Sequence, residues 1–252
     1  MTFIEAIILG VTQGLTEFLP ISSSGHLVII QHLLKIQIKG NEFEVLVHIG
    51  TLGSIVVVFS SDLQALFFNI KSKQSRLYLS YLLITSIPAA LAGILFKNHF
   101  KLFFDNHYFV GKALMFTGLI LILSYFFKPK NKKINFLSSI AIGFFQALAI
   151  IPGISRSGMT ISFALLLGIN AKDAAKFSFL MAIPVIGGAG FLTLLDSYDN
   201  FSFPASQAFA ALTSSFLVGI FALKWLLNWL GEGKFHYFGF YCCVVSILTL
   251  VS

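Results

Sequence analysis

A polar break inside an apolar N-terminal segment constrains this chain more than any other feature. Residues 12–26 read TQGLTEFLPISSSGH and separate two hydrophobic stretches, 2–17 and 26–36. Proline disfavours continuation of a helix, and a membrane-spanning helix needs about 20 apolar residues. Each stretch is therefore too short to cross a bilayer alone. The pattern predicts a re-entrant helical hairpin with a polar apex; one long kinked helix is the alternative.

The same pattern recurs 133 residues later, where residues 145–159 read FQALAIIPGISRSGM. This single offset, without a gap, pairs Gln13 with Gln146 and Gly25 with Gly158. It therefore indicates an internal duplication within one membrane domain, 1–252, with repeat 1 at about 1–127 and repeat 2 at about 134–252. The two copies differ where chemistry would differ, because Glu17, Ser23 and His26 correspond to Ile150, Arg156 and Met159.

The remaining chain is dominated by apolar windows. Of its 252 residues, 57% are hydrophobic and 11% are charged, whereas soluble domains carry about 25% charge. We therefore expect an all-α integral membrane protein with six transmembrane helices and two re-entrant hairpins. Each half holds one hairpin and three spans, and an odd number of spans predicts an inverted-topology repeat. The six predicted spans are 43–60, 77–96, 108–127, 175–195, 206–230 and 236–252.

The basic residues predict the orientation in the membrane. Eleven lysines and arginines fall on the side of the 60–76 loop and five on the other side, with Arg156 left out as a site residue. The positive-inside rule assigns the first side to the cytoplasm. Both termini and the active site should then face the extracytoplasmic side. The net charge of +7 comes from residues near segment ends, so we expect no nucleic-acid partner.

Ionisable residues within membrane segments are costly and typical of functional sites. Glu17, His26 and Arg156 lie at the two predicted apices, and Ser23 offers a hydroxyl beside them. Serines at a helix start can cap it, and exposed N–H groups there favour an anion. The pattern predicts a phosphate-binding site formed by Ser22, Ser24, Gly25, Ser155, Ser157 and Gly158.

Each of these residues also has a structural interpretation. The serines are plain helix caps in that case, and Arg156 forms a structural ion pair with Glu17. His26 then only starts a helix. His48, together with His32 and His99, lacks polar neighbours of the same kind in sequence and is interpreted as a structural or loop residue.

The run QGLTEFLPISSSGH, followed later by PGISRSG, resembles the bacterial undecaprenyl-diphosphate phosphatase family associated with bacitracin resistance. The resemblance covers essentially the whole chain. It implies an enzyme of the bacterial cytoplasmic membrane that hydrolyses undecaprenyl diphosphate to undecaprenyl phosphate and inorganic phosphate. The reaction recycles the lipid carrier for cell-wall polymers and depends on a divalent cation, Mg²⁺ or Ca²⁺.

The resemblance also assigns roles to residues. Its acidic motif falls on Gln13 and Glu17, and many members have glutamate where this chain has Gln13. The metal would then be held by Glu17, with a carbonyl oxygen from Gln13. From the residues themselves, since a hydroxyl nucleophile needs an adjacent base, we expect the nucleophile to be Ser23 or an activated water, with His26 or Glu17 assisting proton transfer. A polyprenyl-phosphate transporter or flippase is the alternative function, since inverted repeats are shared with transporters. A homodimer is also left open.

Overall fold

The computed structural model describes residues 1–36, 38, 42–95, 107–127, 130–196 and 204–251. The regular structure of these residues is helical, with no strand among them, and this confirms the all-α prediction. The helices are α1 (Phe3–Phe18), α2 (Ser23–Leu34), α3 (Glu42–Val58), α4 (Ser60–Phe68), α5 (Lys73–Leu95), α7 (His107–Leu123), η1 (Ser124–Phe126), α8 (Phe136–Leu148), α9 (Arg156–Leu166), α10 (Ala171–Leu180), α11 (Ala182–Asp196), α12 (Ala205–Gly231) and α13 (Tyr237–Val251).

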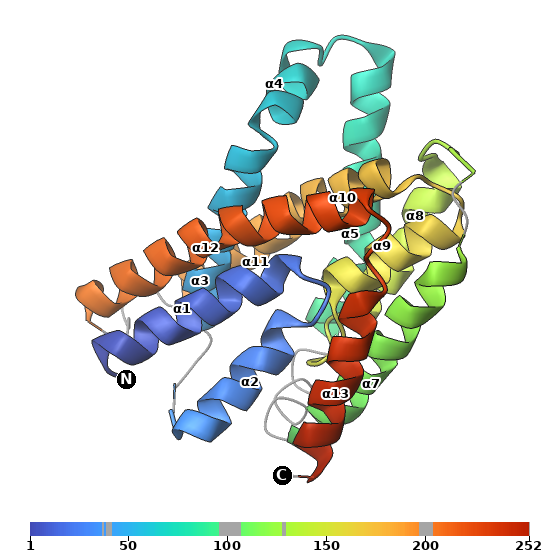
Figure 1. The fold of residues 1–252 in the computed structure, drawn as a ribbon. Helices are drawn as coiled ribbons and strands as arrows, with labels where there is room; N and C mark the ends of the chain where they lie inside the picture. Colours follow the sequence, from blue (N-terminus) through green and yellow to red (C-terminus); the bar gives the residue numbers. More distant parts are fainter. Residues whose placement is uncertain (37, 39–41, 96–106, 128–129, 197–203, 252) are drawn as a thin grey trace.

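Helices α1 and α2 form the first hairpin. A capping box starts α1, in which Thr2 and Glu5 each bond the other's backbone N–H through their side chains. The helix ends at Phe18, two residues before Pro20. The chain then reverses its direction, and α2 runs back from the turn (Figure 1). The predicted break is confirmed, and one continuous helix over residues 2–36 is wrong.

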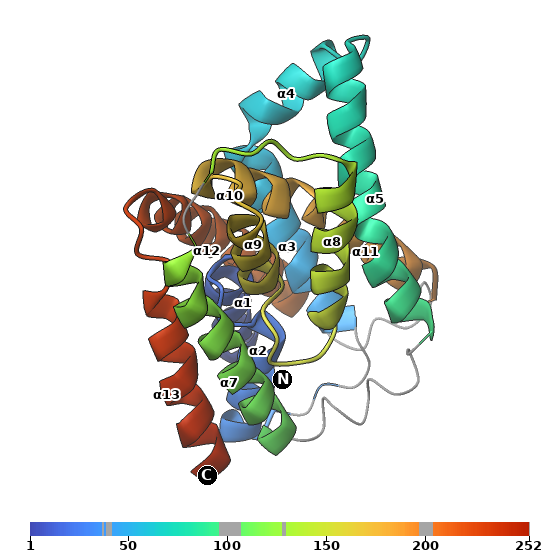
Figure 2. The same ribbon diagram turned by 90° about the vertical axis from the view of Figure 1, so that its right-hand side faces the viewer.

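Helices α8 and α9 form the second hairpin, and they run antiparallel on either side of their turn (Figure 2). Gly153 lies in that turn with φ of +93°, a left-handed backbone that glycine adopts without strain. Its N–H donates to Ser22 Oγ at 3.1 Å. The two polar breaks, distant in sequence, therefore meet in space.

Several helices are apolar enough for a membrane. Lys73–Leu95, Tyr108–Phe126 and Ala205–Gly231 have the length and composition of membrane spans, and α3 with α4 would make a fourth if the bent pair is one span. α8 and α13 are shorter apolar helices. These features fit an integral membrane protein, but the residues described here do not reach the predicted count of six spans.

Two predicted spans differ from the observed helices. The segment at 43–60 ends at Val58, and α4 continues at an angle of 70°. No proline or glycine stands at this bend. The segment at 175–195 is interrupted at Met181. The ring of Pro184 clashes with the carbonyl four residues earlier, which accounts for the end of α10 at Leu180.

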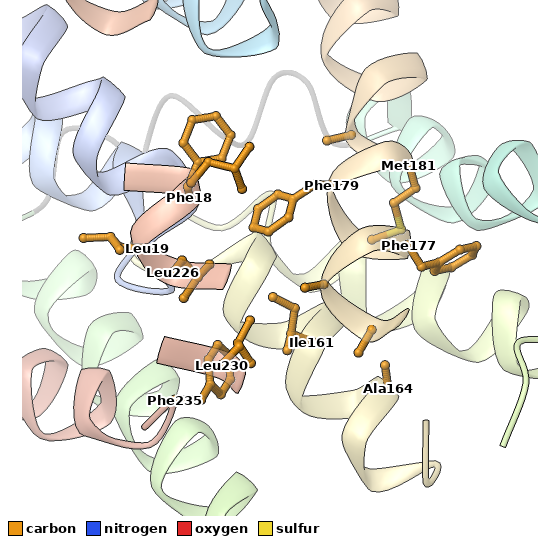
Figure 3. Close-up of a cluster of buried hydrophobic side chains, with 14 of the residues drawn as sticks. Phe18, Leu19, Ile161, Ala164, Phe177, Phe179, Met181, Leu226, Leu230 and Phe235 are labelled. Atoms are coloured by element: carbon orange, nitrogen blue, oxygen red, sulfur yellow. The ribbon is translucent and has the colours of Figure 1, made fainter. Parts of the chain in front are cut away.

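A buried hydrophobic cluster, shown in Figure 3, includes residues of both hairpins. Phe18, at the end of α1, packs edge-on against Phe179 of α10 with ring centroids 5.7 Å apart. Ile161 of α9 and Leu226 of α12 belong to the same cluster. The cluster therefore fixes the end of α1 relative to α9, the two elements that carry Glu17 and Arg156.

Candidate active site

Glu17 lies at the centre of the site and bonds to residues of both hairpins. The residue is 8% exposed and lies on the last turn of α1, next to the break. Oε1 accepts a hydrogen bond from Arg156 Nη2 at 2.5 Å. Oε2 accepts one from Ser23 Oγ at 2.7 Å and one from Gln13 Nε2 at 3.1 Å. One carboxylate therefore joins both hairpins, because Ser23 starts α2 and Arg156 starts α9.

Arg156 is held from two sides. Besides its ion pair with Glu17, its Nη1 donates to the backbone carbonyl of Ser178 on α10 at 3.3 Å. The Ser178 hydroxyl is 2.6 Å from that of Thr160 on α9. The guanidinium carries five N–H donors, so donors remain for an anion. The ion pair with Glu17, which the sequence analysis gave as the structural alternative for Arg156, is present. It lies within the cluster of predicted site residues.

The helix starts are capped as the sequence predicts. Ser22 Oγ accepts from the N–H of Gly25 at 3.3 Å, and Ser155 Oγ accepts from the N–H of Gly158 at 3.1 Å. The hydroxyl of Ser24 lies 3.3 Å from that of Ser22, and the hydroxyl of Ser157 lies 3.3 Å from that of Ser155. Ser22 and Ser155 therefore serve as N-caps that shape the two turns.

His26 is oriented away from the role of a base for Ser23. Its Nδ1 lies 2.8 Å from the carbonyl oxygen of Ser22, and its Nε2 lies 2.9 Å from the hydroxyl of Tyr241 on α13. A carbonyl only accepts, so Nδ1 donates and Nε2 accepts from tyrosine. The hydroxyl of Ser23 donates to Glu17 instead.

Two residues that contact the site, His48 and Tyr241, were not identified from the sequence. His48, interpreted there as a structural or loop residue, lies on α3 with Nε2 3.5 Å from Glu17 Oε2. A signal was present, because Glu44, His48 and Thr51 place polar groups at helical spacing in an apolar helix. Tyr241 gave no signal, since its contact with His26 depends on the packing of a helix 215 residues away.

The residues present fit a divalent cation in one respect. Gln13 is fully buried, and its Oε1 has no hydrogen-bond partner. Buried polar atoms are nearly always paired, and an amide oxygen suits a hard cation. Oε1 of Gln146, at the corresponding position of the second hairpin, is unpartnered as well. In the described part of the chain, no group of three or more His, Cys, Asp and Glu side chains could hold a metal. Glu17 and Gln13 would therefore need ligands from substrate or water.

Comparison with known proteins shows the family of the chain. Residues 6–248 match the family of the bacitracin resistance protein BacA. An undecaprenyl-diphosphatase 2 of Bacillus thuringiensis (strain Al Hakam) is 38% identical, over 98% of this chain and 97% of the relative. Undecaprenyl-diphosphatases of Bacteroides thetaiotaomicron (37% identical, 100% and 99% covered) and Halothermothrix orenii (39%, 100% and 98%) are similar to the same extent. The chain belongs to the BacA bacitracin resistance family.

Proposed function

We propose that this chain is an undecaprenyl-diphosphatase, which hydrolyses undecaprenyl diphosphate to undecaprenyl phosphate and inorganic phosphate. The observation that carries the proposal is the bonding of Ser23 and Arg156 to opposite oxygens of Glu17. A hydroxyl beside a base, and a cation bonded to that same base, are parts that phosphoryl transfer requires. The relatives named undecaprenyl-diphosphatase support the substrate. They also favour the enzyme over the flippase.

In this mechanism Ser23 Oγ attacks the terminal phosphorus while Glu17 Oε2 takes the hydroxyl proton. The bond from that phosphorus to the bridging oxygen breaks, and undecaprenyl phosphate leaves. Water then hydrolyses the phosphoserine and releases inorganic phosphate. The free N–H groups of Arg156 stabilise the charge on the transferring group, an effect that is usually large in such reactions. His26, bound to Tyr241, positions the start of α2.

A divalent cation, Mg²⁺ or Ca²⁺, would be held by Glu17 and Gln13 together with phosphate oxygens. When bound, it neutralises charge on the diphosphate. The unpartnered Oε1 of Gln13 supports this assignment. Ser22, Ser24, Gly25, Ser155, Ser157 and Gly158 would shape the pocket for the phosphates at the two helix starts.

We place the protein in the bacterial cytoplasmic membrane as an inverted repeat of about 1–127 and 134–252 with two re-entrant hairpins. The bias of eleven basic residues to five orients the site toward the extracytoplasmic side. Cysteine labelling in intact cells tests this orientation, with one cysteine introduced at Ser24 after removal of Cys242 and Cys243. A membrane-impermeant thiol reagent is expected to label this cysteine in intact cells. Labelling only after the cytoplasmic face is opened would contradict it.

Phosphate release in detergent tests the reaction. Purified protein should release one phosphate per undecaprenyl diphosphate in the presence of Mg²⁺ or Ca²⁺, which needs no second compartment. Ser23→Ala and Arg156→Ala should each lower kcat/KM by at least about a hundredfold. Ser80→Ala and Arg76→Ala on α5 are the matched controls and should keep full activity. Wild-type protein that releases no phosphate would overturn the proposal. Light scattering in the same detergent determines whether the chain forms a homodimer.

A further inference from the structure

Ser22, in the turn of the first hairpin, has a backbone conformation that depends on its surroundings. Its φ is +70°, an uncommon value for a residue with a Cβ, and such strain persists only where neighbouring contacts hold it. Its carbonyl oxygen accepts two hydrogen bonds from His26, one from the backbone N–H at 3.1 Å and one from Nδ1 at 2.8 Å. His26 therefore holds the residue that directly precedes Ser23.

Tyr241 of α13 holds His26 in turn. Its hydroxyl lies 2.9 Å from Nε2 of His26, and the two rings stack with centroids 5.7 Å apart and planes 12° apart. Because Nδ1 carries the hydrogen, Nε2 accepts from the phenol. A hydrogen bond accepted at one ring nitrogen polarises the imidazole and strengthens the bond that the other nitrogen donates. The phenol therefore fixes the tautomer and the orientation of His26.

A second contact brings α13 to the same turn. Sγ of Cys242, the next residue of the helix, is a weak donor 3.7 Å from the carbonyl oxygen of Pro20. Cys242 is fully buried, whereas Tyr241 is 44% exposed. The tyrosine is therefore not a core residue, and the specific contact that it makes is the one through its hydroxyl.

We propose that Tyr241 is a positioning residue of the proposed reaction and acts through His26. The two hydrogen bonds, from phenol to imidazole and from imidazole to carbonyl, keep Ser22 in the conformation from which Ser23 donates to Glu17. A nucleophilic hydroxyl needs its base within hydrogen-bond reach, so loss of the phenol slows the attack. The inference rests on the proposed function and adds a residue of α13 to it.

NMR of ¹⁵N-histidine in the full-length protein in detergent tests the contact without any turnover. The chain has six histidines, and the signals lost in His26→Gln are those of His26. The wild type should show a hydrogen on Nδ1 of His26 and none on Nε2. Tyr241→Phe removes only the hydroxyl and should move the Nε2 signal, because the accepted hydrogen bond is lost. The matched control is Tyr237→Phe, which changes an exposed tyrosine one turn earlier on α13 and should leave that signal in place.

Phosphate release by the same proteins tests the consequence for the reaction. Tyr241→Phe should lower kcat by about three- to tenfold, the factor expected for one hydrogen bond. Tyr237→Phe should keep the wild-type kcat. In the His26→Gln background, where the series of bonds is already broken, Tyr241→Phe should lower kcat no further. All rates are measured at a temperature at which thermal unfolding shows every variant to be folded.

The outcomes separate this inference from the proposed reaction. A wild type with the hydrogen on Nε2 of His26, or a Tyr241→Phe protein with an unchanged Nε2 signal, overturns the inference even if phosphate is released. A Tyr241→Phe protein with wild-type kcat also overturns it, as does an equal further loss of kcat in the His26→Gln background. A wild type that releases no phosphate overturns the reaction itself, and the NMR signals of His26 distinguish that result from failure of the contact.

Discussion

The two helical hairpins share a sequence pattern but carry different parts of the site. In each, the N-cap serine accepts from the glycine three residues later. In each, the residue directly after the cap bonds Glu17, through a hydroxyl from Ser23 and a guanidinium from Arg156. The capping geometry is the same in both hairpins, whereas the side chain after the cap differs. The two hairpins therefore bring different chemistry to one carboxylate from corresponding positions.

The copies also differ in backbone and in their buried glutamines. Ser22 has φ of +70°, whereas its counterpart Ser155 has φ of −79°. Positive φ is uncommon for serine and is a form of strain typical of functional sites. Gln13 donates to Glu17, but Gln146 donates to the backbone carbonyl of Thr85 near Pro88 on α5. The first hairpin holds the carboxylate, and the second stabilises a helix with a proline inside.

The largest expected effect comes from erasing the carboxylate. Glu17→Ile gives the first hairpin the residue that its counterpart has at position 150. It removes the base for Ser23 and the partner of Arg156, so kcat/KM for phosphate release should fall by at least about a hundredfold. Glu232→Gln, an exposed carboxylate change, should keep full activity. If Glu17→Ile retained a tenth of wild-type activity, the two hairpins would not differ as described.

The turn of the second hairpin should tolerate a side chain at Gly153 less well than the turn between α12 and α13 tolerates one at Gly233. Gly153 stands where the first hairpin has Pro20, and a Cβ there would lie 2.6 Å from the carbonyl oxygen of Val110. Gly153→Ala combines left-handed strain with this clash and should cost about 2–5 kcal/mol of unfolding free energy. Gly233→Ala, also at positive φ but with open space around it, should cost about 1–2 kcal/mol. Thermal unfolding in detergent measures both, and equal losses would contradict the clash.

Substitution of the two buried glutamines should have different effects, one on the stability of the fold and the other on the metal dependence of activity. Gln146→Ala leaves the carbonyl of Thr85 without its side-chain donor and should cost about 1–3 kcal/mol of stability with activity retained. Gln13→Ala should instead weaken the binding of the divalent cation, seen as a higher metal concentration for half-maximal phosphate release. Both variants are compared by the same two measurements. The interpretation fails if the variants exchange these effects.

The smallest expected difference lies between the caps. Ser155→Ala removes an N-cap and should cost about 1 kcal/mol. Ser22→Ala removes a cap and also the acceptor for the N–H of Gly153, so its cost should be larger by about 1 kcal/mol. Equal unfolding temperatures for the two variants would show that the bond between the turns contributes nothing measurable.

The local features of this fold are readable from the sequence, and the contacts between distant helices are not. Pro20 and the serine runs predict the hairpin break, and the offset of 133 residues pairs the two turns. The approach of His48 to Glu17 and of Tyr241 to His26 depends on how α3 and α13 pack, which local periodicity does not encode. The interruption at Met181 was missed although Pro184 marks it. The bend between α3 and α4 has no helix-breaking residue at all.

The bond between the two turns bears on when the protein becomes active during its synthesis. The N-terminal half leaves the ribosome first and brings Glu17 and Ser23, while the guanidinium that completes the cluster is encoded 139 residues after Glu17. The first half alone therefore lacks its cation. Under the proposed mechanism a nascent chain acquires a complete site only when the second turn docks and Gly153 donates to Ser22, so we expect partly translated copies to be inert toward the lipid carrier.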